Sequence, residues 1–389
     1  MPGFELIGQE ELDAIKEVFD KGGILHRYGF EALRNGTYKV TEFEQAVANK
    51  LGVRYAHAVT SGSVALKVAL KALGIGPGDE VITQSFTFVA TVEAIIEVGA
   101  EPVITEIDST FNMDPSDLEA LITPSTKAII PVHMLGVGCD MDAIMNIAKQ
   151  HKLPVLEDAC EAFGATYHNQ ALGTIGTIGA FSFDFGKTIT TGEGGMIVTN
   201  DEDLYRRARE YADHGHEQNP NFPRGKDTRQ RGGFNYRMME LQGAYGLAQL
   251  KKLTPAIAKQ RQSKARLKNM IKDVPGITFR QLSDQDGEAG DTLIFFFGKA
   301  FQAEQFVRAW QAKGFGTKNV PDAIDWHYAG TWDQLLPQYP RYQGKPLSEF
   351  WPHATDLLSR SVALPIMLKF DDTKLTTLAA AVHEIIRSL

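Results

Sequence analysis

Short apolar runs alternate with amphipathic segments along residues 79–200. The runs EVIT, PVIT, KAIIPV and LPVLED recur between helix-like patterns such as VATVEAIIEVGA and MDAIMNIAKQH. Continuous runs rich in Val and Ile, separated by helices, are typical of a mostly parallel sheet that is covered on both faces. We therefore predict an α/β fold whose large domain is built on such a sheet. Two further strands, at 179–183 and 196–199, are predicted to pair like a hairpin.

Three helices are predicted before this region. The first covers residues 5–20, and the second opens with a capping box formed by Thr41 and Glu44 and stops at Gly52. The third follows the small polar turn at residues 61–63 and ends at Gly74.

The pattern changes after residue 253. A long helix from about Met239 to Leu253 is expected to stop before Thr254-Pro255, and a second helical stretch follows it. Beyond that point the elements are fewer and more widely separated. The sequence therefore predicts a large domain over residues 1–255 and a smaller C-terminal α+β domain over residues 256–389.

Composition excludes several classes of protein. The 389 residues carry a net charge of −8, which argues against binding to nucleic acid. No apolar window is long enough for a membrane helix, and the N-terminus lacks the pattern of a secretory signal. The two cysteines, Cys139 and Cys160, support neither a disulfide framework nor a zinc site. We expect a soluble, cytoplasmic protein.

Polar residues follow the ends of successive predicted strands, where α/β proteins bind ligands. Gly62 and Ser63 open a helix that directs backbone N–H groups at an anion, although an ordinary helix cap has the same pattern. Phe88, Asp158 and Lys187 follow later strands. Asp158 needs a cationic partner if it is buried, and a helix-capping or metal-binding role stays open. These residues are expected to share one crevice.

Lys187 lies in the polar loop between the two hairpin strands, where a solvating lysine is unusual. An amine becomes nucleophilic near neutral pH when burial or a neighbouring cation lowers its pKa, and the usual enzymatic partner of such a lysine is an aldehyde cofactor. The alternative is a structural lysine that pairs with Glu193.

The order of these motifs resembles that of the DegT/DnrJ/EryC1/StrS family of sugar aminotransferases, over nearly the whole chain. The shared segments are GIGPGDEVI, TFVATVEAI, EDACEA, SFDFGKTITTGEGG, FNYRMMELQGAYGLAQLKKL and a late LPI. The resemblance implies the aspartate-aminotransferase-type fold (fold type I) and pyridoxal 5'-phosphate as the cofactor. It also implies a cytoplasmic homodimer with shared active sites.

The resemblance assigns roles to residues of this chain. Lys187 would bind the cofactor covalently and move the proton, Asp158 would pair with the pyridine nitrogen, and Phe88 would stack on the ring. The phosphate would be held by Gly62, Ser63, Ser182 and, from the neighbouring subunit, Asn235.

Two positions depart from the family pattern. The usual Ser-Gly-Thr is Ser-Gly-Ser here, which keeps the hydroxyl at Ser63. Glu161 stands where Gln or His is frequent, as in some perosamine-forming members. A carboxylate beside the phenolic oxygen of the cofactor implies that one of the two groups is protonated.

Four residues are expected to contact substrate: His214, His216, Arg229 and His327. The first two belong to a DHGH segment that resembles a metal cluster, but histidines two apart across a glycine are rarely zinc ligands without a third. Arg229 belongs to a basic loop that begins at Arg224 and is suited to a small anion. A solvated charged face is the alternative for that loop.

The predicted reaction moves an amino group from an amino acid, glutamate foremost, to the carbonyl of an oxo-sugar. The opening MPGFEL, the lysine motif and DHGH are most similar to enzymes that make 8-amino-3,8-dideoxyoctulosonate. A nucleotide-linked 4-keto or 3-keto hexose is the alternative acceptor. A sugar dehydratase of the same family carries His where Lys187 stands, and a DNA-binding regulator would need a further domain, so both are disfavoured.

Overall fold

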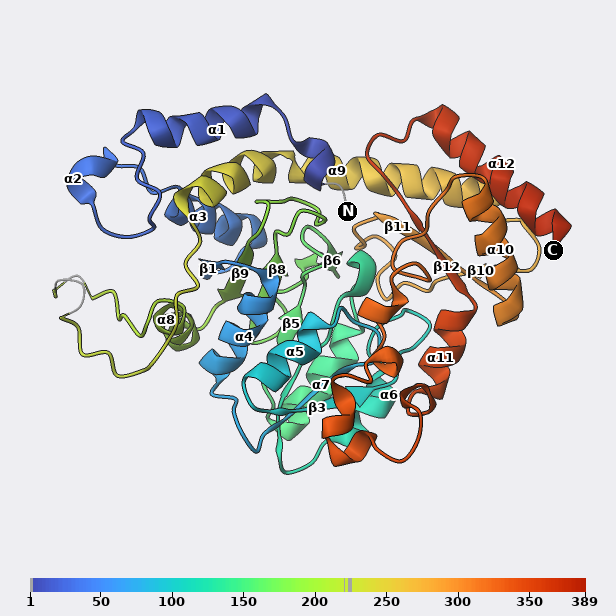
Figure 1. Ribbon diagram of the computed structural model, residues 1–389, viewed down its shortest axis with the longest axis horizontal. Helices are drawn as coiled ribbons and strands as arrows, with labels where there is room; N and C mark the ends of the chain where they lie inside the picture. The colour runs from blue at the N-terminus through green and yellow to red at the C-terminus, as the bar shows by residue number, and fades with distance from the viewer. Residues whose placement is uncertain (1–2, 220, 223–225) are drawn as a thin grey trace.

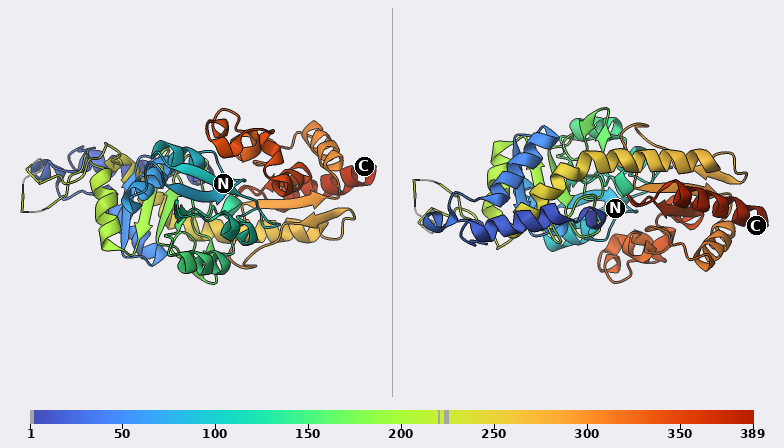
Figure 2. Two further views of the ribbon diagram at one scale, coloured as in Figure 1. Left: turned by 90° about the horizontal axis from the view of Figure 1, so that it is seen from below. Right: turned by 90° about the horizontal axis from the view of Figure 1, so that it is seen from above.

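The computed structural model describes residues 3–219, 221–222 and 226–389. The molecule is elongated, and the central sheet and the C-terminal part lie side by side along its length (Figures 1 and 2). Helix α9 (Glu240–Ile271) runs along both parts.

The central sheet has two runs of strands, ordered β1-β9-β8-β5 and β3-β2-β4. Backbone bridges between Ile129 and Val155 and between Val132 and Asp158 join the two runs. Within the described part of the chain, β9 is the one strand of this sheet that is antiparallel to its neighbours, so the predicted mixed, mostly parallel sheet is confirmed. The strands are β1 (Tyr55–Val59), β2 (Glu80–Gln84), β3 (Glu101–Thr105), β4 (Thr126–Ile129), β5 (Leu156–Asp158), β8 (Ile178–Ser182) and β9 (Gly195–Thr199), with a small hairpin of β6 (Thr166–Tyr167) and β7 (Gln170–Ala171) beside them.

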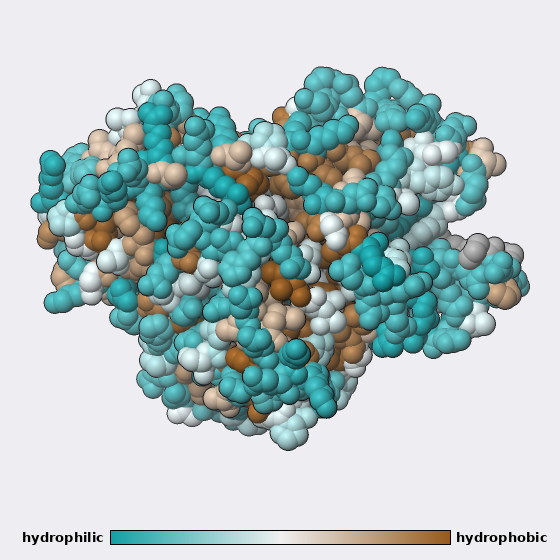
Figure 3. All heavy atoms as spheres, turned by 180° about the vertical axis from the view of Figure 1, so that it is seen from behind, coloured by the Kyte–Doolittle hydropathy of each residue, from teal (hydrophilic) through white to brown (hydrophobic). Residues whose placement is uncertain are grey.

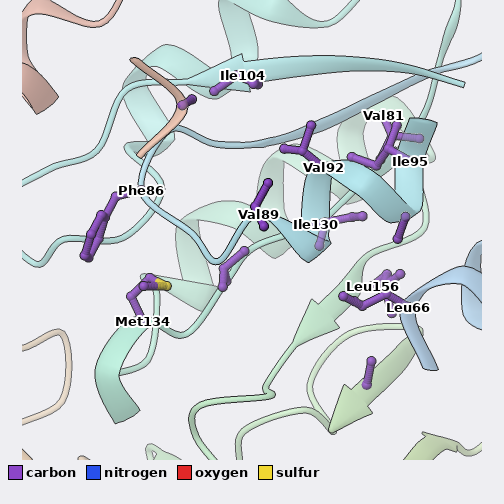
Figure 4. Close-up of a cluster of buried hydrophobic side chains, with 14 of the residues drawn as sticks. Leu66, Val81, Phe86, Val89, Val92, Ile95, Ile104, Ile130, Met134 and Leu156 are labelled. Atoms are coloured by element: carbon purple, nitrogen blue, oxygen red, sulfur yellow. The ribbon is translucent and has the colours of Figure 1, made fainter. Parts of the chain in front are cut away.

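Both faces of the sheet are buried. Leu66, Val81 and Ile130 belong to one apolar cluster (Figure 4), whereas the next residue of β2, Ile82, belongs to a second cluster together with Phe43. Apolar residues at consecutive strand positions are what a sheet covered on both sides requires. The covering helices are α4 (Gly62–Leu73), α5 (Ala90–Glu97), α6 (Pro115–Leu118), α7 (Met141–His151) and α8 (Glu202–Tyr211).

The N-terminal helices differ from the prediction in where they begin. Residues Gly3–Leu6 form a separate 3₁₀ turn, η1, and helix α1 covers Gln9–Asp20. A short α2 (Glu31–Arg34) precedes α3 (Lys39–Leu51), which ends at Gly52 as predicted.

The predicted capping box of Thr41 and Glu44 is wrong, because both residues lie inside α3. Glu44 is buried, pairs with the guanidinium of Arg27 and accepts a hydrogen bond from the Ala58 backbone N–H at 2.6 Å. A buried carboxylate needs such partners, which only the folded chain supplies.

Helix α9 continues through Pro255, so the predicted stop at Thr254-Pro255 is also wrong. An interior proline costs a helix about 3 kcal/mol. Packing offsets that cost, since α1 and α3 contact α9 on one side of the molecule and α12 contacts it on the other.

The C-terminal part is an antiparallel sheet with helices against it. Its core takes Leu267 and Ile271 from α9 together with Phe295 and Trp310, so α9 contributes to the cores on both sides of residue 255. The division at 255/256 stays a prediction. The elements are β10 (Ile277–Phe279), β11 (Thr292–Phe297), α10 (Ala300–Ala312), α11 (Pro352–Ser359), β12 (Ser361–Pro365) and α12 (Asp372–Ser388).

The surface is mostly hydrophilic, with apolar residues gathered toward the middle of the face shown in Figure 3. In the described ranges, no helix combines the length and the apolar character needed to cross a membrane.

Candidate active site

A cavity of about 270 Å³ opens where the N-terminus of α4 meets the carboxyl ends of β5 and β8. The sequence predicted that polar residues at strand ends would share one crevice, and the fold brings most of them together. The predicted site residues that line this cavity are Gly62, Ser63, Phe88, Asp158, Glu161, Ser182, Lys187 and His327.

The first turn of α4 forms one end of the cavity. Ser61 caps the helix by accepting a hydrogen bond from the Val64 N–H at 3.2 Å. The N–H groups of Gly62 and Ser63 lie in the first turn, where no carbonyl of the helix can accept from them, and the helix dipole adds positive charge there. A Cβ on Gly62 would lie 2.6 Å from the Ser182 Cβ, so the turn and Ser182 approach as closely as glycine permits. The unpaired first-turn N–H groups and the positive end of the helix dipole make this end of the cavity suited to an anion.

Asp158 supplies a negative charge to the same cavity. Its side chain is buried, Oδ2 accepts a hydrogen bond from the Thr91 hydroxyl at 2.7 Å, and Oδ1 accepts one from the Cys160 N–H at 3.1 Å. The Thr91 hydroxyl lies 2.7 Å from that of Thr87. The two threonines, which the sequence analysis did not single out, therefore hold the carboxylate in one orientation.

The amine of Lys187 lies 3.5 Å from the Glu161 carboxylate, and the other oxygen of Glu161 accepts the Leu135 N–H at 3.0 Å. Burial disfavours the charged amine, but the negative charges of Glu161 and Asp158 outweigh it and raise the pKa of Lys187 above its usual value. Burial likewise disfavours the Glu161 carboxylate, yet the charge of Lys187 holds the pKa of that group below its usual value. The two groups form a charged pair.

Nucleophilic attack near neutral pH needs an amine with a lowered pKa. In the protein without a ligand, the pKa of Lys187 is raised instead. The reason is the excess of acidic groups around a single lysine. A ligand that brings positive charge to Asp158 would weaken the field that keeps the proton on Lys187.

Aromatic side chains form the outer wall. Phe88 is 40% exposed; its ring stacks on Trp326 at 6.4 Å between centroids and contacts His327 at 5.4 Å. The backbone N–H groups of Thr87 and Val89 donate to the carbonyls of His327 and Trp326, each at 2.9 Å. The C-terminal part of the chain is thereby fastened to the rim of the cavity.

Four predicted site residues do not line the cavity of their own chain. His214 and Arg229 are exposed, His216 pairs with Asp227 at 3.3 Å, and Asn235 forms a backbone bridge with Asp213. All four belong to the connection between α8 and α9. Arg224, at the start of the basic loop, lies outside the described residues.

The cavity fits pyridoxal phosphate in both charge and shape. A phosphate suits the α4 end, a cationic ring nitrogen suits the buried carboxylate of Asp158, and the exposed Phe88 ring offers a face for stacking. Lys187 is the one lysine among the described residues that line the cavity, so it is the amine available to the aldehyde group. Together with the fold, these features define a pyridoxal-phosphate-dependent enzyme of fold type I.

Comparison with known proteins identifies the family. The chain belongs to the DegT/DnrJ/EryC1/StrS aminotransferase family, whose model matches residues 7–383. It is 35% identical to the spore coat polysaccharide biosynthesis protein SpsC of Bacillus subtilis, over 98% of this chain and 96% of that protein. It is 49% identical to GDP-perosamine synthase of Caulobacter vibrioides over 222 residues, which are 56% of this chain and 58% of that synthase.

A solved structure gives the same result. Bacillus subtilis NtdA with its bound cofactor PMP matches with a TM-score of 0.84 and 26% identity, over 99% of this chain and 84% of that one. The chain is thus a pyridoxal-phosphate-dependent sugar aminotransferase by family and by fold.

Proposed function

We propose that this protein transfers an amino group from an amino acid, glutamate foremost, to the carbonyl carbon of a nucleotide-linked keto-hexose. The observation that carries the proposal is the presence of a carboxylate, that of Glu161, in the cavity beside Lys187. This carboxylate pairs with Lys187 inside the cavity, and the chain is 49% identical, over 222 residues, to a relative that is named for making GDP-perosamine. The sequence resemblance likewise places a carboxylate at this position in some perosamine-forming members.

In this proposal each cavity residue has a defined task. Pyridoxal phosphate, when bound, supplies the electron sink that stabilises negative charge on the substrate carbon. Asp158, oriented by Thr91, would hold the proton on the ring nitrogen, and Phe88 would cover one face of the ring. The phosphate would lie at the α4 end, against Gly62, Ser63 and Ser182. Lys187 would carry the proton to and from the substrate carbon.

The free octulosonate remains the competing acceptor. A sugar acid needs a cationic fork or several donors for its carboxylate, and Arg is the residue best suited to that task. The basic side chains among the described residues that line the cavity are Lys187 and His327, and Lys187 already has a role. The residues expected to bind that carboxylate, His214, His216 and Arg229, lie in the α8–α9 connection instead. A nucleotide diphosphate needs cationic partners as well, so the preference for the nucleotide-linked acceptor rests on the similarity to GDP-perosamine synthase.

The acceptor is tested by offering the purified enzyme glutamate with a panel of oxo-sugars. The panel contains GDP- and UDP-linked 4-keto and 3-keto hexoses and the free 8-oxo-3,8-dideoxyoctulosonate. We expect 2-oxoglutarate release with a nucleotide-linked keto-hexose at a kcat/KM at least about tenfold above that for the free acid, which corresponds to about 1.4 kcal/mol in transition-state binding. A higher kcat/KM for the free octulosonate would instead identify that sugar acid as the acceptor.

We further propose a homodimer in which Asn235 contacts the phosphate in the partner's cavity. Asn235 does not line its own cavity, and it stands between two exposed apolar residues, Phe234 and Met239, which a partner would cover. Many enzymes of this size are twofold dimers with self-complementary interfaces.

Subunit mixing tests this arrangement. An inactive Lys187→Ala chain mixed with an Asn235→Asp chain, whose added charge would repel the phosphate, places one unmutated site in each heterodimer. Random pairing should restore about a quarter of wild-type activity, because half of the dimers are mixed and each has one intact site. Mixing Lys187→Ala with Lys187→Arg is the matched control and should restore none. No recovery in the first mixture, with heterodimers demonstrated by mass, would contradict shared sites.

A further inference from the structure

The turn Gly3–Leu6, called here the N-terminal strap, has no role in the proposed chemistry, yet it lies directly on the loop that carries Lys187. The Gly3 N–H donates a hydrogen bond to the Lys187 carbonyl oxygen at 2.8 Å. The Phe4 ring stacks on that of Phe185 at 5.6 Å between centroids, with 18° between the planes. The strap thus contacts both the backbone of the lysine and a side chain two residues before it.

The approach at Gly3 leaves no room for a side chain. A Cβ at this position would lie 2.6 Å from the Lys187 carbonyl oxygen and 3.0 Å from the backbone of Ile189 and of Thr190. All three neighbours are backbone atoms, which cannot move aside without moving the loop. Gly8, five residues later, differs: the nearest atom to its Cβ would be a side-chain oxygen of Glu10 at 3.1 Å.

The other end of the strap is fixed to the C-terminal part of the chain. The Glu5 carboxylate accepts hydrogen bonds from the backbone N–H groups of Leu368 at 2.8 Å and Lys369 at 3.4 Å, just beyond β12. The Leu6 carbonyl accepts one from the Lys252 amine of α9 at 2.7 Å. In Figures 1 and 2 the blue start of the ribbon accordingly lies near the middle of the molecule, beside α9.

Helix α9 supports the far side of the same loop. Gln249 is fully buried; its side-chain oxygen accepts the Thr190 N–H at 3.3 Å, and its amide nitrogen donates to Glu11 at 3.0 Å. The lysine loop is therefore held from two directions, by the strap at Lys187 and by α9 at Thr190. Glu11 belongs to the helix that follows the strap, so both supports connect to the same N-terminal segment.

We propose that the N-terminal strap positions Lys187 for proton transfer, and that Glu5 is a positioning residue that couples the C-terminal part of the chain to the lysine loop. Among the described residues, the strap's hydrogen bond to the cavity lining is the one to the Lys187 backbone carbonyl, so its effect is on where the amine is aimed. A misplacement of about 1 Å at a reacting group lowers a rate by about 10²-fold. The expected effect on kcat rests on the proposed function, whereas the expected effect on the structure of the lysine loop does not.

Gly3→Ala is the direct test, with Gly8→Ala as the matched control. We expect Gly3→Ala to accelerate hydrogen exchange of the backbone amides in residues 184–191 of the apoprotein by at least about fivefold, and to lower kcat by about tenfold or more with KM for the sugar within about twofold. Gly8→Ala should change neither. Unchanged exchange in Gly3→Ala, with the chain folded, overturns the inference.

Glu5→Gln keeps the shape of the side chain and removes its charge, and Glu31→Gln at the exposed start of α2 is its control. We expect Glu5→Gln to accelerate the same exchange to a lesser degree and to lower kcat rather than raise KM. Equal kinetics and exchange in Glu5→Gln and wild type would remove Glu5 from the proposal. The exchange measurement uses no substrate, so it stands even if no sugar of the panel is aminated, and the two proposals fail separately.

Discussion

Lys187→Ala is expected to lose at least about 10³-fold of transamination activity, because positioned proton transfer alone contributes on the order of 10²–10⁴-fold and the covalent link to the cofactor is lost with it. Lys187 is the one lysine among the described residues that line the cavity, so no neighbouring amine can replace it. Treatment of the holoenzyme with borohydride should fix the cofactor to the chain, and peptide mapping should find it on Lys187.

Lys187→Arg separates charge from nucleophilicity. Arginine retains a cation beside Glu161 and so preserves the pair seen at 3.5 Å, but its guanidinium stays protonated and cannot attack an aldehyde. We expect it to fold as the wild type does and to be as inactive as the alanine variant. Lys39→Ala, at a residue that does not line the cavity, is the control and should be fully active. A reduced adduct on another lysine, or turnover in Lys187→Ala near that of wild type, would end the assignment.

The alternation of strands and helices was predictable because a sheet buried on both faces leaves a continuous apolar run at every strand. Val81 and Ile82 belong to different apolar clusters, one on each face of the sheet, and the consecutive apolar residues of EVIT already indicate this double burial. The errors lie where distant contacts decide. The sequence around Pro255 does not show that α1, α3 and α12 pack against α9 and stabilise the helix beyond the proline. The sequence around Glu44 does not show that its carboxylate pairs with Arg27.

The site could be predicted to the extent that it lies at strand ends. Asp158 is the last residue of β5, and Lys187 lies in the loop after β8. The two strands are parallel neighbours, so the convergence of these residues follows from topology. Thr91 was missed because a threonine within a helix has no distinctive pattern, although it follows Phe88 by about one helical turn in TFVATVEAI. The field that raises the pKa of Lys187 depends on side chains from several elements, which no single motif contains.

The α8–α9 connection was the least predictable part of the site. Its arginines were candidates by residue type and its histidines by the DHGH resemblance, and no strand or helix end fixes their direction. In the fold, His216 faces Asp227, and Arg231 faces Glu210 of α8. These pairs stabilise the connection itself, so a substrate role for this loop depends on the neighbouring subunit.

Asp158 should also be needed for turnover, with a smaller loss than at Lys187 and with a holoenzyme that stays intact. Asp158→Asn preserves the size of the side chain and an oxygen that can accept a hydrogen bond from Thr91 or Cys160. It removes the negative charge that would keep the ring nitrogen protonated, so the electron sink weakens while the cavity keeps its shape. We expect cofactor binding within a few-fold of wild type and a loss of kcat of about 10²-fold or more, the usual cost of removing one electrostatic contact from an active site.

Two further variants make this test specific. Asp140→Asn removes a carboxylate that caps α7 outside the cavity, and it should change the stability of the protein without changing kcat. Thr91→Val removes the hydroxyl that donates to Asp158 at 2.7 Å but leaves the charge, so its loss of kcat should be smaller than that of Asp158→Asn. If Asp158→Asn turned over within a few-fold of wild type, or if Thr91→Val were the more damaging change, the charge of Asp158 would not be what the reaction requires.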